Sequence, residues 1–245
     1  MGKIYMSYFK GYLSRLMKLQ FDESADKDDL MGAEDSAKKG FFSSKPTLKN
    51  RSTVFSLGNR GSVLTSDLEG PIIVPHASQK QETKHNFESL FRSLHFALMD
   101  NCCREYLFLV DFFMVSGSSA TDLFNAIMSK TLSLFLTKME ENTLECYDSI
   151  AVFLCIHIVY RYKVMMNKRG VPAIDRYWDT LVDRMWPRFQ LVLEMNIHSV
   201  RAVDPSKLGH IDVRPHYITR RYAEFSAAIV GVNQSFPDDR VFQLL

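Results

Sequence analysis

The chain has 245 residues, of which 46% are hydrophobic and 24% charged, with a net charge of +2. This is the balance of a soluble globular protein that is long enough to bury a core. The near-neutral charge gives no overall attraction to nucleic acid, for which a strongly basic face is expected. The four cysteines, two of them adjacent at Cys102 and Cys103, do not form the framework of a secreted disulfide protein and favour a reducing cytosolic compartment.

The two ends of the chain carry little targeting information. The first residues lack the charged-then-apolar order of a signal peptide, and Met6 occupies the position where myristoylation requires Ser or Thr. Residues 241–245 contain none of the residue types that usually close a helix, which predicts that the full-length form continues.

Residues 1–35 are predicted to form an N-terminal helix followed by an acidic segment. Residues 22–35 carry seven acidic side chains and a single lysine, which indicates a solvated loop or helix end. A metal-binding loop is the alternative, but the D-x-D-x-D-G ladder of a calcium hand is absent. The helix is expected over residues 2–20, where apolar and aromatic residues recur at helical spacing: Ile4, Tyr5, Tyr8, Tyr12, Leu16 and Leu19.

Residues 36–84 are predicted to be a loop-rich, partly disordered linker. The segment is rich in Ser, Gly, Pro and Thr and has no sustained periodicity. Because a compact domain seldom contains so long a structureless connection, we expect short helical turns near Phe41 and Phe42 and at residues 53–57. The fragment L-G-N-R-G-S lacks the spacing and the lysine of a phosphate-binding loop.

A helical body is predicted from residue 85 to residue 245. After a first helical stripe, residues 106–115 are apolar on nearly every side, except for Asp111. If Asp111 is buried, it must be paired, and pairing with an Arg or Tyr on a neighbouring helix is favoured over catalysis. Gly117 then breaks the pattern, and Ser119 with Asp122 resembles a capping box that opens the next helix.

Residues 150–160, I-A-V-F-L-C-I-H-I-V-Y, are the most continuously apolar run. Eleven helical residues span roughly 16 Å, about half of what a bilayer core requires, so the run predicts a buried helix of a soluble protein. Cys155 behaves there as a small hydrophobe, and His157 is interpreted as a satisfied core or groove histidine rather than a ligand. The helix is expected to stop at Gly170.

Proline marks the last helices. Pro172 is well placed as the first residue of the next helix, Pro187 should kink that helix, and Pro215 should restart the chain as a helix. No alternating strand pattern of useful length occurs, so the predicted fold class is all-α.

The motif search assigns no catalytic, cofactor-binding or metal-binding residue. No histidine stands at the helical spacing of a zinc site, and the serines near Gly117 lack the form of a nucleophile elbow. The polar cluster that remains is the candidate partner-binding set Arg214, His216, Tyr217, Arg220 and Arg221.

Three interpretations of this basic and aromatic cluster stay open. It could be an intramolecular network in which Arg220 or Arg221 pairs with carboxylates such as Glu224 or Asp175. It could contact a protein partner, or it could bind phosphoinositide or nucleic acid. The sequence predicts that Arg221→Ala leaves the fold intact.

Long stretches of the sequence resemble the vacuolar protein sorting-associated protein 52 family. The run R-P-H-Y-I-T-R-R-Y-A-E-F-S (214–226) is similar to that family, as are G-K-I-Y-M-S-Y-F-K (2–10) and K-D-D-L-M-G-A-E-D-S-A-K-K-G-F-F-S (27–43). So are F-R-S-L-H-F-A-L-M-D-N (91–101), C-R-E-Y-L-F-L-V-D-F-F (103–113), the apolar run, and the segment from R-Y-W-D to L-E-M-N (176–196). Residues 77–86 show no family pattern.

The resemblance implies an elongated helical bundle or rod of the multisubunit tethering type. Members of that family are the Sac2-type subunit of the Golgi-associated retrograde protein complex and have no catalytic centre, cofactor or small-molecule substrate. The implied partners are three sister vacuolar-protein-sorting subunits, which an endosomal recycling complex partly shares, and Golgi SNAREs of the syntaxin type, with no nucleic acid. The implied site of action is the cytoplasmic face of trans-Golgi network and endosome membranes, through peripheral association.

Overall fold

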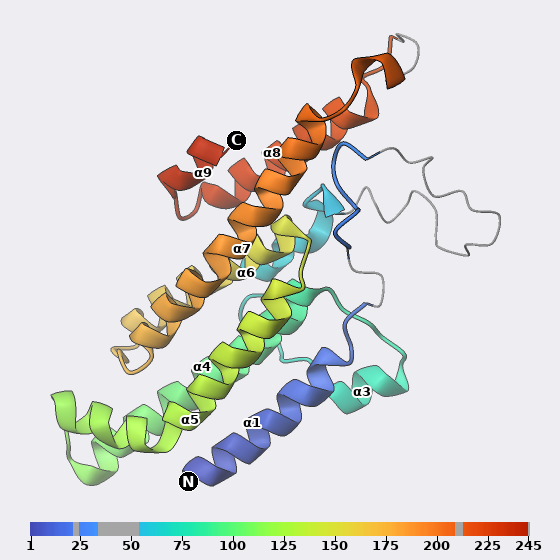
Figure 1. The fold of residues 1–245 in the computed structure, drawn as a ribbon. Coiled ribbons are helices and arrows are strands. Elements are labelled where there is room, and N and C mark those ends of the chain that lie inside the picture. The colour runs from blue at the N-terminus through green and yellow to red at the C-terminus, as the bar shows by residue number, and fades with distance from the viewer. Residues whose placement is uncertain (22–24, 34–53, 209–212, 245) are drawn as a thin grey trace.

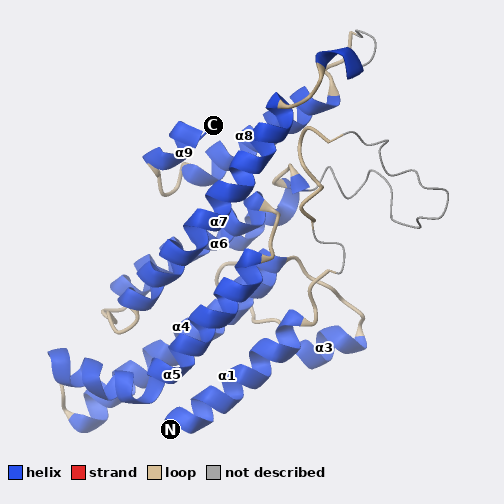
Figure 2. Ribbon diagram, viewed as in Figure 1, coloured by secondary structure: helices blue, strands red, loops and turns tan. Residues whose placement is uncertain are grey.

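The structure is a computed structural model that describes residues 1–21, 25–33, 54–208 and 213–244. Within these ranges the regular structure is helical, and a lone backbone bridge joins Gln20 to His85 (Figure 2). The predicted all-α fold is therefore confirmed. The predicted turn at Phe41 and Phe42 lies outside the described residues.

Four long helices and several short ones make up the described fold. The long helices are α4 (Phe87–Phe113), α5 (Gly117–Leu144), α6 (Ser149–Lys168) and α7 (Asp175–Arg201). The shorter elements are α1 (Gly2–Met17), α3 (Pro75–Lys80), α8 (Tyr217–Asn233), α9 (Asp239–Leu244) and the 3-10 helices η1 (Gly58–Leu64) and η2 (Pro205–Lys207).

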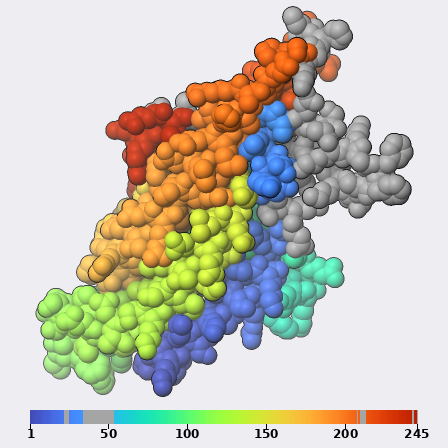
Figure 3. All heavy atoms as spheres, in the orientation of Figure 1, coloured from blue at the N-terminus to red at the C-terminus, as the bar shows by residue number. Residues whose placement is uncertain are grey.

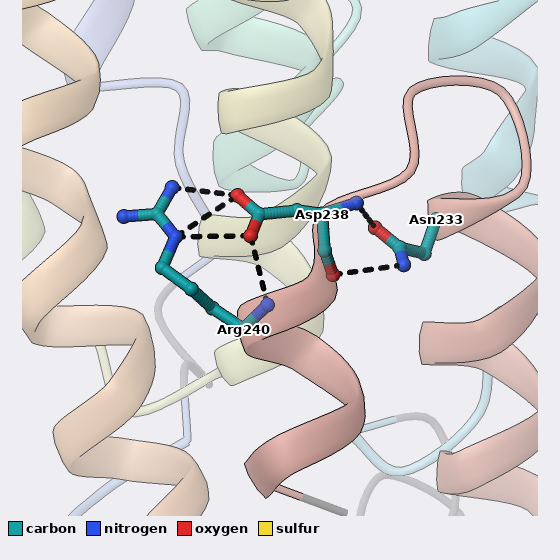
Figure 4. Close-up of polar contacts among 3 residues, drawn as sticks. All are labelled: Asn233, Asp238 and Arg240. Atoms are coloured by element: carbon teal, nitrogen blue, oxygen red, sulfur yellow. Dashed lines mark hydrogen bonds and ion pairs between the residues drawn. The ribbon is translucent and has the colours of Figure 1, made fainter.

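The long helices lie along one diagonal axis and give the body an elongated outline (Figures 1 and 3). Helix α6 packs against α4, α7, α8 and η1, whereas α1 packs against α4 and α5. The predicted elongated helical bundle is confirmed.

Helix α6 is the central element of the core. All of residues 150–159 are buried, and Phe153 stacks on Phe189 of α7 with ring centroids 4.6 Å apart. Among the described helices, α6 is the one that is long and apolar enough to cross a membrane, but most of it is buried inside the protein. An apolar composition is also typical of a core helix, and the burial of α6 confirms the prediction that residues 150–160 form a buried helix.

Both ends of α6 follow local sequence signals. Asp148 is the N-cap, and its Oδ1 accepts a hydrogen bond of 2.9 Å from the backbone N–H of Ala151. At the other end Gly170 adopts a φ of +67°, the left-handed conformation in which glycine commonly ends a helix. The predicted stop at Gly170 is confirmed.

Three predicted helix starts are wrong by two or three residues. Helix α5 begins at Gly117 with Ser116 as N-cap, so Ser119 and Asp122 lie inside its first turns and form no capping box. Helix α7 begins at Asp175, because Pro172 lies in the preceding turn, where its carbonyl accepts the N–H of Asp175 at 3.1 Å. Helix α8 begins two residues after Pro215, with His216 as its N-cap.

The structure gives the burial that the sequence left open on α1 and at Asp111. The core side of α1 is formed by Phe9, Leu13 and Leu16, whereas Ile4 and Tyr8 are exposed, so the buried face is rotated relative to the stripe of aromatic and apolar residues. Asp111 is exposed, so it needs no buried partner. The second half of the 106–115 run is solvent-facing as well.

Candidate interaction site

The candidate residues lie at the start of α8, and the structure divides them into two groups. Arg214 and Arg220 are exposed, and His216 and Tyr217 are half-buried. Arg221, next to Arg220 in sequence, has a residue exposure of only 7%. Successive helical residues point about 100° apart, so neighbouring arginines can face solvent and protein.

Arg221 holds α8 against the segment at residues 25–33. Its guanidinium donates hydrogen bonds to the backbone carbonyls of Met31 at 3.1 Å and Ala33 at 3.0 Å. It also lies over the ring of Tyr217, 4.7 Å from the centroid, and 5.7 Å from the ring of Phe55. Among the described residues it therefore uses carbonyls and rings, and neither Glu224 nor Asp175 is its partner.

The same segment is fixed to α7 by polar groups that the sequence did not single out. The backbone N–H of Met31 donates to Oδ1 of Asn196 at 3.0 Å, and the N–H of Gly32 donates to Oγ of Ser199 at 2.9 Å. Asn196 is buried and its amide nitrogen bonds the carbonyl of Val192 at 2.9 Å. Segment 25–33, α7 and α8 thus form one junction, which joins chain positions more than 150 residues apart.

Gly32 is required at this junction by close approach. A Cβ on Gly32 would overlap the backbone carbonyl of Ser199, and a helix backbone cannot yield as a flexible side chain can. We expect Gly32→Ala to lower the free energy of unfolding by about 2 kcal/mol, within the range of overpacking.

Gly11 of α1 provides the matched control for Gly32→Ala in thermal melts. A Cβ on Gly11 meets no atom within 4 Å, so Gly11→Ala should raise stability by about 0.5–1 kcal/mol through helix propensity. Equal melting shifts for the two variants would contradict the packing argument.

The buried position of Arg221 reverses the prediction that Arg221→Ala leaves the fold intact. Removing the guanidinium leaves two carbonyls without their charged donor, and we expect a loss of about 2–3 kcal/mol in the free energy of unfolding. Arg220→Ala should change stability by no more than about 0.5 kcal/mol, because Arg220 is exposed. Urea titration of both variants separates the two neighbours, and similar midpoints would contradict the assignment.

A second feature that could bear chemistry is a cleft of about 520 Å³ beside the start of α6, with Glu88, Asp148 and Cys146 among its lining residues. Arg60 also lines the cleft, donating to Oε1 of Glu88 at 2.7 Å and pairing with Oδ2 of Asp148 at 2.8 Å. Burial alone would lower the pKa of Arg60, but the two neighbouring carboxylates outweigh it and raise the pKa above its ordinary value. This network clamps η1 to α4 and α6.

Burial shifts the pKa values of several titratable groups in the cleft. Burial raises the pKa of the Cys146 thiol to about 12, so it carries no thiolate at neutral pH. Burial also raises the pKa of Asp148, against the attraction of Arg60 that lowers it. Within the described ranges no three His, Cys, Asp or Glu residues come together as a metal site.

Comparison with known proteins gives the family directly. A family model described as "Vps52, C-terminal" matches residues 1–245, the whole of the chain. The chain belongs to this Vps52 C-terminal family. The resemblance seen in the sequence is thereby confirmed.

Curated Vps52 relatives match over nearly the whole chain. The dog "vacuolar protein sorting-associated protein 52 homolog" is 59% identical over 246 residues and the human one 58%, each covering 100% of this chain and 34% of the relative. The Caenorhabditis elegans homolog is 40% identical over 235 residues, covering 93% of the chain. This chain therefore spans about a third of the length of these relatives. No solved structure matches it.

Proposed function

We propose that this chain is the C-terminal helical part of a non-enzymatic vesicle-tethering subunit that acts in retrograde transport from endosomes to the trans-Golgi network. The supporting observation is the Vps52 C-terminal match over residues 1–245. The proposed complex is of the Golgi-associated retrograde protein type, with three sister sorting subunits and an endosomal recycling counterpart that shares some of them. Syntaxin-type Golgi SNAREs are further proposed partners.

The fold suits such a role better than it suits catalysis. Its long helices form an elongated body with two separated ends, which can hold partners apart (Figure 3). The cleft beside α6 holds an arginine clamped between two carboxylates, a stabilising arrangement rather than a reactive one. Peripheral attachment to the cytoplasmic face of the membranes through the complex follows from the proposal.

The test uses the human relative at full length, because this chain covers 34% of it. Cells depleted of the endogenous protein are complemented with the intact relative, or with a chimera in which this 245-residue sequence replaces the matched region. We expect the chimera to co-purify with the sister subunits and to restore recycling of retrograde cargo. Normal cargo recycling in depleted cells without complementation would contradict the proposal.

A second candidate function rests on the exposed arginines at the start of α8. Arg214 and Arg220, with His216 and Tyr217 beside them, could bind a partner, a phosphoinositide headgroup or nucleic acid. Because Arg221 is buried, the test variant is Arg214→Ala with Arg220→Ala. Retention on phosphoinositide liposomes or RNA that is unchanged in this double variant removes the lipid and nucleic-acid candidates.

A further inference from the structure

A row of residues on α4 changes from covered to exposed along one face of the helix. The row steps by three or four residues, so its members lie on one side of the helix. Its first members are buried, with exposures of 0%, 7% and 5% at Leu94, Ala97 and Glu105, whereas Phe108 and Phe112 are 50% and 66% exposed. The half-buried Asn101 completes the row between Ala97 and Glu105.

Helix α1 packs against α4 alongside the buried part of this row. Tyr12 Oη and Ser93 Oγ share a hydrogen bond of 2.8 Å, and Tyr5 Oη donates to Oε2 of Glu105 at 2.6 Å. The later residue of α1, Tyr12, meets the earlier residue of α4, Ser93, and the earlier residue Tyr5 meets the later residue Glu105. The two helices therefore run antiparallel. Glu105 therefore contacts α1 near its first residues, and the row on α4 continues beyond the N-terminal end of α1.

Phe108 and Phe112 lie three and seven residues beyond Glu105, which corresponds to roughly 4.5 and 10 Å along the helix. Their rings stack with centroids 5.3 Å apart. Figure 1 shows the joined ends of α4 and α5 projecting past the start of α1, so α1 does not reach this part of the hairpin. The two rings form an ordered apolar surface in line with α1.

Helix α5 borders the same surface. The start of α1 presses on it, since a Cβ on Gly2 would lie 2.8 Å from the carbonyl oxygen of Ile127. One turn further toward the hairpin end, Leu123 is half-buried. Beyond the start of α1, both α4 and α5 continue toward the hairpin end, with the exposed Phe108 and Phe112 on α4 and the half-buried Leu123 on α5.

We propose that Phe108 and Phe112 receive an amphipathic helix that continues the line of α1 on its N-terminal side, supplied by the part of longer family members that this chain does not span. Continuity with the α1 interface supports this occupant, because the same α4 face already packs against an antiparallel helix. The matched family is C-terminal and the mammalian relatives are covered to 34%, so such members hold the additional chain. The exposed Asp111 beside the row favours a basic residue on the incoming helix.

The experiment measures backbone hydrogen exchange of residues 104–114 in two proteins. One is the 245-residue chain, and the other is that chain lengthened by about 30 residues that precede the matched region in the human relative, enough for a helix of roughly 45 Å. We expect exchange in this stretch to slow at least tenfold on lengthening, and the slowing to disappear in Phe108→Ser with Phe112→Ser. Equal exchange in the short and lengthened chains would overturn the proposal.

Two controls keep the result specific. The matched variant Leu144→Ser removes a 57% exposed leucine at the other end of α5, and its lengthened chain should keep the slow exchange. In the 245-residue chain the double serine variant should melt with the parent, since both rings are exposed. If instead the 245-residue chain sediments as a dimer that the double variant abolishes, the row binds a second copy and the proposed occupant is wrong.

Discussion

Leu154→Asp is expected to abolish folding of the whole helical body. Leu154 is fully buried in the middle of α6, the helix that contacts α4, α7, α8 and η1. The variant loses the leucine's burial, about 2–3 kcal/mol, and places a carboxylate where the surrounding run of α6 is apolar. The combined loss of about 5 kcal/mol or more matches the entire stability of many domains. Circular dichroism should show lost helix, and thermal melts should show no cooperative transition.

Val164→Asp is the matched control on the same helix. Val164 is 37% exposed, so its aspartate can remain hydrated, and we expect a loss of no more than about 1 kcal/mol. If Leu154→Asp melted with the parent, α6 would not be the core helix that its burial indicates. Binding of any partner should be lost in Leu154→Asp and kept in Val164→Asp, since the surfaces depend on an intact body.

The central helix could be predicted because its signals are local. The apolar run of residues 150–160 covers only about half of a bilayer core and so indicates a buried helix. Gly170 supplies the backbone conformation that ends the helix. Fold class and the buried α6 follow from such patterns alone. Helix starts were less accurate because proline restricts its own φ without fixing where the first hydrogen-bonded turn begins.

Which arginines of the candidate site are exposed and which is buried could not be predicted, because burial here depends on contacts between residues distant in sequence. Arg220 and Arg221 are alike in type and neighbourhood, but only Arg221 meets the carbonyls of Met31 and Ala33, 190 and 188 positions away. The glycine that fits against Ser199 gives no local signal either. A basic cluster read from sequence therefore mixes surface residues with one that holds the fold together.

His157 shows the same limit in the core. The sequence predicts a satisfied core or groove histidine. Its burial is confirmed, but among the described residues neither ring nitrogen has a hydrogen-bond partner. The ring instead lies edge-on to Phe153 at 4.5 Å, with Tyr160 and Phe236 on its other sides. Phe153 and Tyr160 are neighbours of His157 on the same helix, but Phe236 follows α8 in the chain and reaches His157 only through the tertiary fold. The local sequence therefore predicts only part of the aromatic cage.

The cage around His157 and the buried His95 should make stability fall steeply in mild acid. Burial lowers the pKa of each imidazole from its ordinary 6.5 to about 4, and Arg161 adds to the effect at His157. Between these values the unfolded chain binds protons that the folded chain excludes, so the free energy of unfolding decreases as pH falls from 6.5 toward 4. Each histidine contributes roughly 3 kcal/mol to the total loss, most of which develops between pH 6.5 and pH 4.

The two histidines should respond differently to substitution, which separates their contributions. His157→Phe removes two unpartnered nitrogens from an aromatic cage, so it should flatten the pH dependence without a large loss of stability at pH 7. His95→Phe also flattens it, but loses hydrogen bonds of 2.9 Å to the Phe91 carbonyl and 2.8 Å to the Tyr177 hydroxyl, and should destabilise by about 2 kcal/mol at pH 7. Urea titrations from pH 4 to pH 7.5, with the exposed His76→Gln as control, measure both effects. Parent and variants share every carboxylate, so differences between their profiles of unfolding free energy against pH report the histidines alone. If the His157→Phe profile ran parallel to that of the parent, burial would not be keeping this ring neutral.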